Sequence, residues 1–165
     1  VSVLDGDTLR TGLCSDLGCS REARQENLRR AAEVAKVMRN AGMLVIASFI
    51  SPFRAERETL VDIVGDGFYE VYIEASLETC EDRDPKGLYS RARAGAIQNF
   101  TGISSPYEPP EKPAIRICTD SASVEESAHK LMMAMADLGL LRISKKDLPR
   151  RVQHTVMVNH NFRAQ

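Results

Sequence analysis

Two carboxylates stand two residues apart near the start of the chain. Asp5 and Asp7 flank Gly6 and follow residues 1–4, a mostly apolar run typical of a buried parallel strand that ends at a functional loop. Glycine between the carboxylates lets the backbone approach a ligand closely. One or two carboxylates together with substrate phosphates are enough to hold Mg²⁺. The motif therefore indicates magnesium binding and proton handling, with an ordinary polar turn as the alternative.

A guanidinium and an amide share one face of a predicted helix. Arg24 and Asn27 are three residues apart, and Arg10 precedes them. Arginine binds phosphate or sulfate oxygens in a bidentate manner, and an amide beside it can recognise a base edge. The same helix carries several other basic residues, so on spacing alone a solvated helix face is the simpler interpretation.

A serine follows the second apolar run. Ser51 precedes Pro52, where the next helix can present free backbone amides to an anion. Ser51 is therefore a candidate phosphate ligand or nucleophile. Because no histidine or other base lies within its local motif, helix capping is the simpler interpretation.

A long segment rich in glycine, proline and basic residues spans residues 84–113, which we call the lid segment. Its composition is typical of a mobile loop over a site. Positive charge is concentrated in and just before it, at Arg83, Lys86, Arg91 and Arg93. Phe100 offers a flat face to a base. A basic closing loop neutralises charge, positions reactants and excludes water, as phosphoryl transfer requires, and an ordinary long basic loop is the alternative.

Helices and strands are predicted to alternate along residues 1–141. Apolar runs predict strands over residues 1–4, 43–49, 68–73 and 115–118. Caps and periodicity predict helices over residues 21–41, 56–64, 77–83 and 124–138. The inward stripe of the last helix is predicted to comprise Val124, Ala128, Leu131, Met132, Met135 and Leu138. Such alternation implies a parallel sheet with helices on both faces and ligands at the carboxyl ends of the strands.

The end of the chain shows no helical or strand period. Residues 142–165 contain Lys145, Lys146, Arg150 and Arg151 and are predicted to form a basic tail or linker. One domain, residues 1–141, precedes it.

Bulk composition excludes several classes of function. A net charge of −1 gives no domain-wide attraction to nucleic acid or membrane. The four cysteines have neither metal-ligand nor disulfide spacing, which favours reduced thiols in a cytoplasmic protein. We therefore expect a soluble domain whose ligands are small molecules.

Six motifs, taken in order, resemble adenylylsulfate kinases over roughly the first 140 residues. They are Leu4-Asp-Gly-Asp, Ala47-Ser-Phe-Ile-Ser-Pro, Arg83-Asp-Pro-Lys-Gly-Leu-Tyr, Ala92-Arg-Ala-Gly, Asn99-Phe-Thr-Gly-Ile and Pro106-Tyr-Glu. The resemblance implies a three-layer α/β fold of the P-loop kinase type with a lid. It also implies transfer of the ATP γ-phosphoryl group to the 3′-hydroxyl of adenylylsulfate with Mg²⁺, the activation step of sulfate assimilation.

The resemblance assigns a role to each candidate residue. Asp5 resembles the magnesium-side carboxylate, and Asp7 the residue that orients or deprotonates the 3′-hydroxyl. Ser51 aligns with a proposed phosphoserine intermediate, although direct in-line transfer is the simpler mechanism. Substrate binding is implied for Asp7, Arg10, Arg24, Asn27, Ile50, Ser51, Lys86 and Phe100, and Ala122 falls where the family approaches the ATP base.

Three features depart from the usual family pattern. Thr8 stands where Asn usually follows Asp-Gly-Asp, and Cys19 where Phe usually follows Leu-Gly. The sequence contains no Gly-x-x-x-x-Gly-Lys-[Ser/Thr], the loop that cradles the β- and γ-phosphates. The sequence starts at what should be the family's second strand, so we expect an N-terminally incomplete domain. Its sheet would lack a central strand and expose the apolar edges of the neighbouring strands.

The missing loop leaves two functions open. One is an adenylylsulfate kinase represented without its phosphate loop, and the alternative is a truncated, non-catalytic module that binds adenylylsulfate or regulates a partner. The resemblance also leaves open a fusion or association with ATP sulfurylase, and a homodimer.

Overall fold

The computed structural model describes residues 1–141 and 154–160 and contains each of the predicted strands and helices. It adds two helices, residues 6–10 and 88–93, and one strand, residues 154–160, that the sequence did not predict. The strands are β1 (Ser2–Asp5), β2 (Leu44–Phe49), β3 (Phe68–Glu74), β4 (Ile115–Cys118) and β5 (His154–His160). The helices are α1 (Gly6–Arg10), α2 (Arg21–Asn40), α3 (Arg54–Val64), α4 (Leu77–Arg83), α5 (Leu88–Arg93) and α6 (Val124–Asp137).

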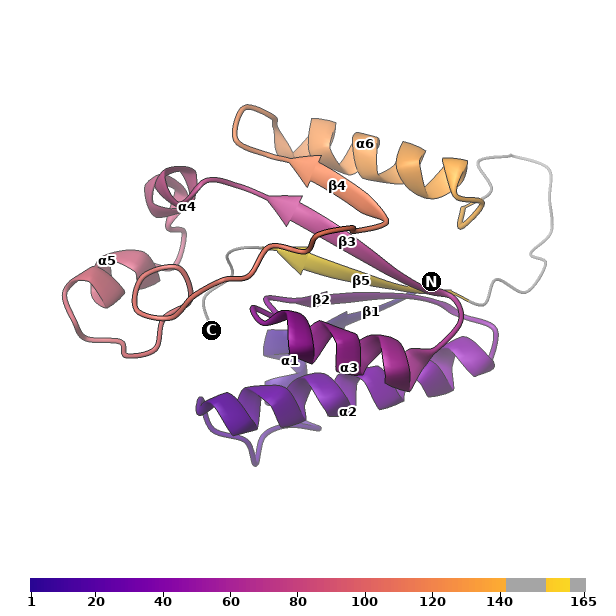
Figure 1. Cartoon of the computed structure of the whole chain (residues 1–165), viewed down its shortest axis with the longest axis horizontal. Helices are drawn as coiled ribbons and strands as arrows, with labels where there is room; N and C mark the ends of the chain where they lie inside the picture. Colours follow the sequence, from indigo (N-terminus) through magenta and orange to yellow (C-terminus); the bar gives the residue numbers. More distant parts are fainter. Residues whose placement is uncertain (142–153, 161–165) are drawn as a thin grey trace.

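The strands form one parallel sheet in the order β1-β2-β5-β3-β4. Helices α2 and α3 lie on one side of the sheet, and α6 lies on the other (Figure 1). The predicted three-layer α/β fold is therefore confirmed. Among the described residues, none of the helices combines the length and apolar composition that a membrane crossing requires.

Two predicted helix starts are confirmed by their caps. The Ser20 hydroxyl accepts the N–H of Ala23 at 3.2 Å at the start of α2. At the start of α6, the N–H of Glu126 donates to the Ser123 hydroxyl at 3.1 Å, and the Glu126 carboxylate accepts the Ser123 N–H at 2.8 Å. Each cap satisfies backbone donors that have no partner inside the helix, which is why the sequence predicts these starts well.

The prediction for the inward stripe of α6 is wrong in part. Met135 is buried and Leu131 packs against the core, but Val124 is 80% exposed, and Met132 and Leu138 are also exposed. Ala128 is exposed as well, and α6 packs mainly through its C-terminal half, where Leu131, Ala134 and Met135 meet the core. Apolar periodicity thus predicts the helix correctly, but it does not predict which turns of the helix pack against the sheet.

Strand β5 corrects the prediction that residues 142–165 form a basic tail or linker without strand period, whereas the basic residues Lys145, Lys146, Arg150 and Arg151 lie outside the described residues. It pairs in parallel with β2 and with β3, so that Met157 lies opposite both Ala47 and Glu70. The resemblance predicts that this central position, which the family's first strand would take, is empty. β5 occupies it, so the exposed edges expected on β2 and β3 are absent from the described sheet. The apolar run of the strand is short and flanked by polar residues, so its period is too brief to be recognised.

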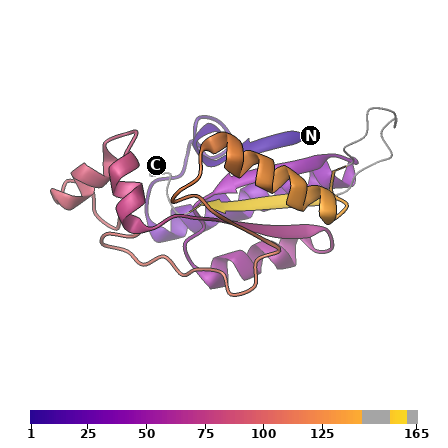
Figure 2. The same ribbon diagram turned by 90° about the horizontal axis from the view of Figure 1, so that it is seen from above.

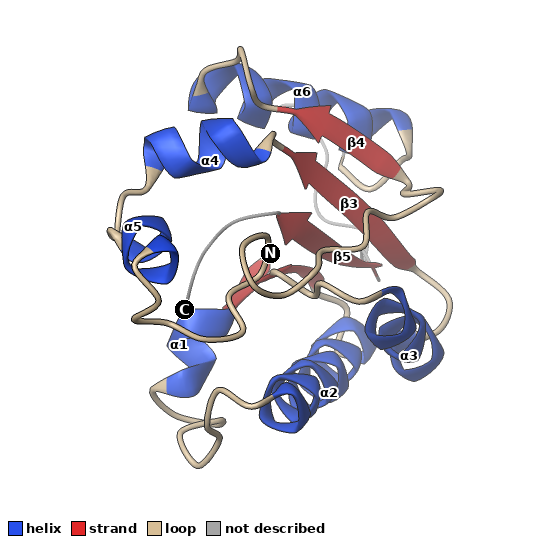
Figure 3. Ribbon diagram, turned by 60° about the vertical axis from the view of Figure 1, so that its left-hand side comes forward, coloured by secondary structure: helices blue, strands red, loops and turns tan. Residues whose placement is uncertain are grey.

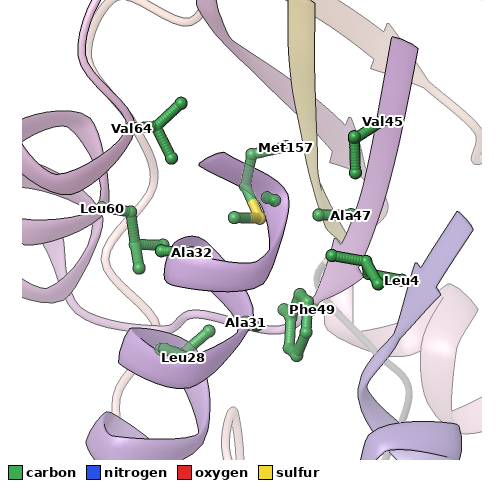
Figure 4. Close-up of a cluster of buried hydrophobic side chains, with 11 residues drawn as sticks. Leu4, Leu28, Ala31, Ala32, Val45, Ala47, Phe49, Leu60, Val64 and Met157 are labelled. Carbon is green, nitrogen blue, oxygen red and sulfur yellow. The ribbon is translucent and has the colours of Figure 1, made fainter. Parts of the chain in front are cut away.

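Both cores depend on β5. On the α2 and α3 side, Met157 packs with residues of β1, β2 and both helices: Leu4, Val45, Ala47, Phe49, Leu28, Ala31, Ala32, Ala35, Leu60 and Val64 (Figure 4). On the α6 side, Val156 and Val158 pack with Leu44, Val71, Ile115, Ile117, Met135 and Leu140. Alternate side chains of one strand thus enter opposite cores, as a strand buried on both faces requires.

An acid-sensitive ion-pair network holds α2 to the segment before it. Glu26 pairs with Arg29 at 2.7 Å and with Arg30 at 2.9 Å, and Arg30 reaches Asp16 at 2.6 Å. The hydrogen bonds from Arg29 and Arg30 lower the pKa of Glu26 to about 2. This carboxylate therefore stabilises the fold above its unfolded pKa of about 4.5, and the contribution is lost as the pH falls toward 2.

We expect Glu26→Gln to lower the melting temperature at pH 7 and to have little further effect near pH 2. The difference between wild type and variant should shrink as the pH falls from about 4.5 to about 2, because wild-type Glu26 is then protonated as well. Thermal unfolding followed by circular dichroism at several pH values measures this. Glu33→Gln is the control, because Glu33 also faces Arg29 but only across a longer distance, 3.9 Å. A difference that does not depend on pH would contradict the prediction.

The lid segment and α4 form a lobe of their own. α4 and α5 project beyond the strands on one side of the molecule (Figures 1 and 2). A small core of Cys80, Tyr89, Ala92 and Phe100 joins them. Burial raises the pKa of the Cys80 thiol to about 11, so this sulfur stays protonated at neutral pH. Part of the lid segment is thus helical and packed, whereas its mobility stays a prediction.

Candidate active site

The carboxyl ends of all strands meet at one edge of the sheet. α1 follows β1 there, the Ser51 turn follows β2, and α4 follows β3. Figure 3 shows α4 and α5 on the side toward which the arrows of β3, β4 and β5 point. Because the sheet is parallel, residues far apart in sequence converge at this edge, as predicted.

The two aspartates after β1 have different surroundings. Oδ1 of Asp5 accepts the N–H groups of Asp7 and Thr8, both at 3.1 Å, and so caps α1. Oδ2 of Asp7 lies 2.8 Å from Nζ of Lys86, a residue 79 positions later in the lid segment. The Lys86 contact brings the lid segment onto the β1 end. Both partners of this pair are partly exposed, so it contributes less than about 1 kcal/mol of stability.

The acidic groups here suit Mg²⁺ bound with phosphates. Among the described residues, no group of three His, Cys, Asp or Glu side chains is placed to hold a metal ion. Mg²⁺ usually takes one or two carboxylates and completes its shell with waters and substrate phosphates. Asp5 and Asp7 at the end of β1 fit that donor set, so the cation would bind together with a nucleotide.

Asn27 carries a buried acceptor with no partner in the described structure. It is 2% exposed, and no described group donates a hydrogen bond to its Oδ1. Leaving a buried acceptor unsatisfied costs about 1–3 kcal/mol. A native protein tolerates that cost where a ligand or a water supplies the donor. The solvated-face interpretation of this part of α2 is therefore wrong for Asn27.

Arg24 and Arg10 tie different segments together. Nη1 of Arg24 donates to the carbonyl of Asn99 at 3.2 Å, which links α2 to the lid segment. Nη1 of Arg10 donates to the carbonyl of Gly18 at 2.9 Å and closes the loop between α1 and α2. The structure thus brings Arg24 to the lid, while Arg10 holds the loop that precedes α2.

Ser51 is not the cap of α3. Phe53 is the N-cap residue, and it makes no side-chain cap hydrogen bond. Ser51 is 2% exposed and has a φ of 36°, in the left-handed region that non-glycine residues rarely adopt. The half-buried Ile50 precedes it. Strained backbone of this kind is common at functional sites, which keeps Ser51 a candidate ligand.

The basic residues of the lid are not equivalent. Arg83 donates to the Thr119 hydroxyl at 3.1 Å and so anchors the end of α4 to the loop after β4, which contains Ala122. Arg91 and Arg93 are both exposed, and Arg93 pairs with Glu81 on the surface of the lobe. Only Lys86 of the four predicted basic residues contacts another candidate side chain in the described structure.

Phe100 lies inside the lid core. Its ring packs edge to face on Tyr89, with centroids 5.0 Å apart, and the residue is 6% exposed. Stacking of Phe100 on a substrate base therefore stays a prediction.

Asp84 is a residue of the lid whose role the sequence did not indicate. It accepts the N–H groups of Leu88 and Tyr89 and caps α5. The signal for it is an aspartate shortly before a Gly-Leu helix start.

The chain is similar to a large group of adenylylsulfate kinases. A family model described as adenylylsulphate kinase matches residues 1–118. The adenylyl-sulfate kinase of Acaryochloris marina is 52% identical over 141 residues, which are 85% of this chain and 69% of that protein. That of Aeromonas hydrophila is 54% identical over 134 residues, 81% of this chain and 68% of the relative.

Solved structures show the same likeness. The Mycobacterium tuberculosis APS kinase CysC in complex with AMPPNP and APS superposes with a TM-score of 0.76 at 43% identity, covering 82% of this chain and 80% of that one. A hexameric APS kinase from Thiobacillus denitrificans gives a TM-score of 0.61 at 26% identity, covering 86% of this chain and 23% of that one.

Proposed function

Because this chain belongs to the adenylylsulfate kinase family, we propose that it binds adenylylsulfate at the carboxyl ends of β1 and β2 for phosphorylation at the 3′-hydroxyl by ATP. The observation that carries the proposal is the unsatisfied, buried Oδ1 of Asn27 beside Arg24. An adenine amino group donates the hydrogen bond that this oxygen needs, and a guanidinium suits the sulfate and phosphate oxygens of the same ligand.

The proposed chemistry is direct in-line transfer. Asp7 orients the 3′-hydroxyl or accepts its proton, and Lys86 places a positive charge beside the atoms where negative charge develops. Ser51 and Ile50 line the substrate at the β2 end. Asp5 would hold Mg²⁺ together with the phosphates, and the bound ion would supply further charge neutralisation.

The lid completes the proposed site. Arg10, Arg24 and Asn27 hold the adenylylsulfate, Phe100 contributes an aromatic wall, and Ala122 approaches the ATP base. Arg83 sets the distance between the lid and the loop of Ala122 through Thr119. Arg91 and Arg93 add positive charge to the lid, which favours an anionic substrate before closure.

Different parts of the chain have different roles in this proposal. Residues 1–141 supply the adenylylsulfate-binding machinery, and β5 completes the sheet. The sequence contains no phosphate-loop motif, so transfer at full rate requires one from a longer chain. We further propose a cytoplasmic protein that acts with Mg-ATP, as a homodimer and in association with ATP sulfurylase.

Two measurements on purified protein test the function. Calorimetric titration should show that this chain binds adenylylsulfate. With Mg-ATP and adenylylsulfate, 3′-phosphoadenylylsulfate should form only with a chain extended by upstream coding sequence that carries a phosphate loop. Absence of adenylylsulfate binding by both chains would overturn the proposal. Binding without transfer by either chain would favour the non-catalytic module.

A further inference from the structure

The Ser51 turn needs support from outside itself. Its φ of 36° places a non-glycine residue in the left-handed region, a strained conformation for a residue with a side chain. Such a conformation persists only where surrounding groups hold it. Ser51 is also almost completely buried, so water does not solvate its backbone carbonyl.

Arg57, in the first turns of α3, holds that carbonyl. Its Nη1 donates to the Ser51 oxygen at 2.8 Å, and its Nη2 donates to the Glu108 carbonyl at 2.6 Å. Nε pairs with Glu70 of β3 at 2.9 Å. Arg57 is 4% exposed, and a buried guanidinium is costly unless its donors are satisfied. All three contacts are therefore needed to offset the burial of the Arg57 guanidinium.

The segment that returns from the lid, residues 106–111, meets the same turn. The N–H of Glu108 donates to the Pro52 carbonyl at 2.8 Å, and the Glu108 carboxylate accepts the N–H of Arg54 at 2.7 Å. The ring of Tyr107 lies 5.9 Å from the Arg57 guanidinium. One buried cation thus contacts both the substrate-side turn and the return segment of the lid.

We propose that Arg57 is a positioning residue for adenylylsulfate, one that fixes the Ser51 turn and the lid's return segment in a single geometry. The inference rests on the proposed function of this site. Because one guanidinium donates to both segments, a shift of either segment that draws Arg57 with it weakens the hydrogen bond of Arg57 to the other. The sequence does not predict this role, because Arg57 lies in a stretch of alternating charges that resembles a solvated helix face.

Variants of Arg57 test the inference when affinity and stability are measured together. Arg57→Met should weaken adenylylsulfate binding in calorimetric titration by about tenfold or more, because both carbonyls lose their donor. Arg57→Lys should restore part of the affinity, since an ammonium group reaches one carbonyl. Leu60→Ala is the control: it opens a cavity one turn later in the same helix and lowers the melting temperature without touching the Ser51 turn.

A double-mutant cycle examines the turn directly. Glycine adopts a positive φ without strain, so Arg57→Met should cost less affinity in a Ser51→Gly background than in the wild type. Additive losses would overturn the inference. It would also be overturned if Arg57→Met left the affinity unchanged, or if Leu60→Ala lost as much affinity as Arg57→Met at equal melting temperature.

A readout that needs no ligand separates this inference from the proposed function. Hydrogen exchange of the Glu108 amide should speed up in Arg57→Met, because the return segment loses its anchor. Wild-type protein that fails to bind adenylylsulfate overturns the proposed function. Unchanged exchange at Glu108 overturns the coupling whether or not the ligand binds.

Discussion

Met157→Asp is expected to abolish cooperative folding of this chain. Met157 has no exposed surface and packs in the core between the sheet and α2 and α3. A carboxylate at this position is buried without a partner, which costs several kcal/mol. Total stabilities of such domains are about 5–15 kcal/mol, so one such charge removes most or all of the margin.

The position of β5 makes the effect larger than for a peripheral core residue. In the described sheet β2 and β3 both pair with β5 and not with each other. Displacing β5 therefore unpairs two further strands and opens both cores, because Val156 faces the opposite core from Met157. Unpaired inner edges also promote aggregation.

Circular dichroism and urea denaturation measure the outcome. Val124→Asp is the matched control, since it introduces the same carboxylate at an apolar residue that is 80% exposed. The control should unfold within a few degrees of the wild type, as exposed substitutions usually do. A folded Met157→Asp chain with an unchanged urea midpoint would show that β5 does not hold the sheet together.

Asn27→Leu is expected to weaken adenylylsulfate binding strongly while leaving the fold intact. The side chain is buried, and its Oδ1 has no donor in the described structure. Leucine has a similar volume and no acceptor to satisfy, so the melting temperature should stay constant or rise. The affinity should fall roughly 10- to 100-fold, the effect of one lost hydrogen bond in a desolvated site.

The control for Asn27→Leu is Gln25→Leu. Gln25 is an exposed amide on the same helix, so this variant makes the same chemical change outside the site. Calorimetric titration with adenylylsulfate and a thermal melt are done on both variants. Loss of stability together with affinity in Asn27→Leu would show that the amide is structural, and retained affinity would remove it from the substrate site.

Local features of this protein could be predicted from sequence because short-range interactions determine them. The hydroxyl of Ser20 and the reciprocal Ser123–Glu126 pair cap helices within one turn of their own position. The carboxylates after β1 were predicted to lie at a strand end for the same reason, since an apolar run that stops at Asp-Gly-Asp is a local signal.

The arrangement of the lid around the site depends on contacts between distant segments. The contact of Lys86 with Asp7 spans 79 positions, and the packing of Phe100 against Tyr89 in the lid core depends on how α4 and α5 meet. Neither has a periodic signature in the sequence.

The centre of the sheet shows the division most clearly. By itself, the sequence determined the alternation of strands and helices, the capped helix starts and the family motifs of residues 1–108. Only the tertiary structure placed residues 154–160 between β2 and β3 and Arg57 beneath Ser51. The physical reason is that a short strand and a buried cation gain their stability from partners far away in the chain, so their own residues resemble those of an ordinary polar segment.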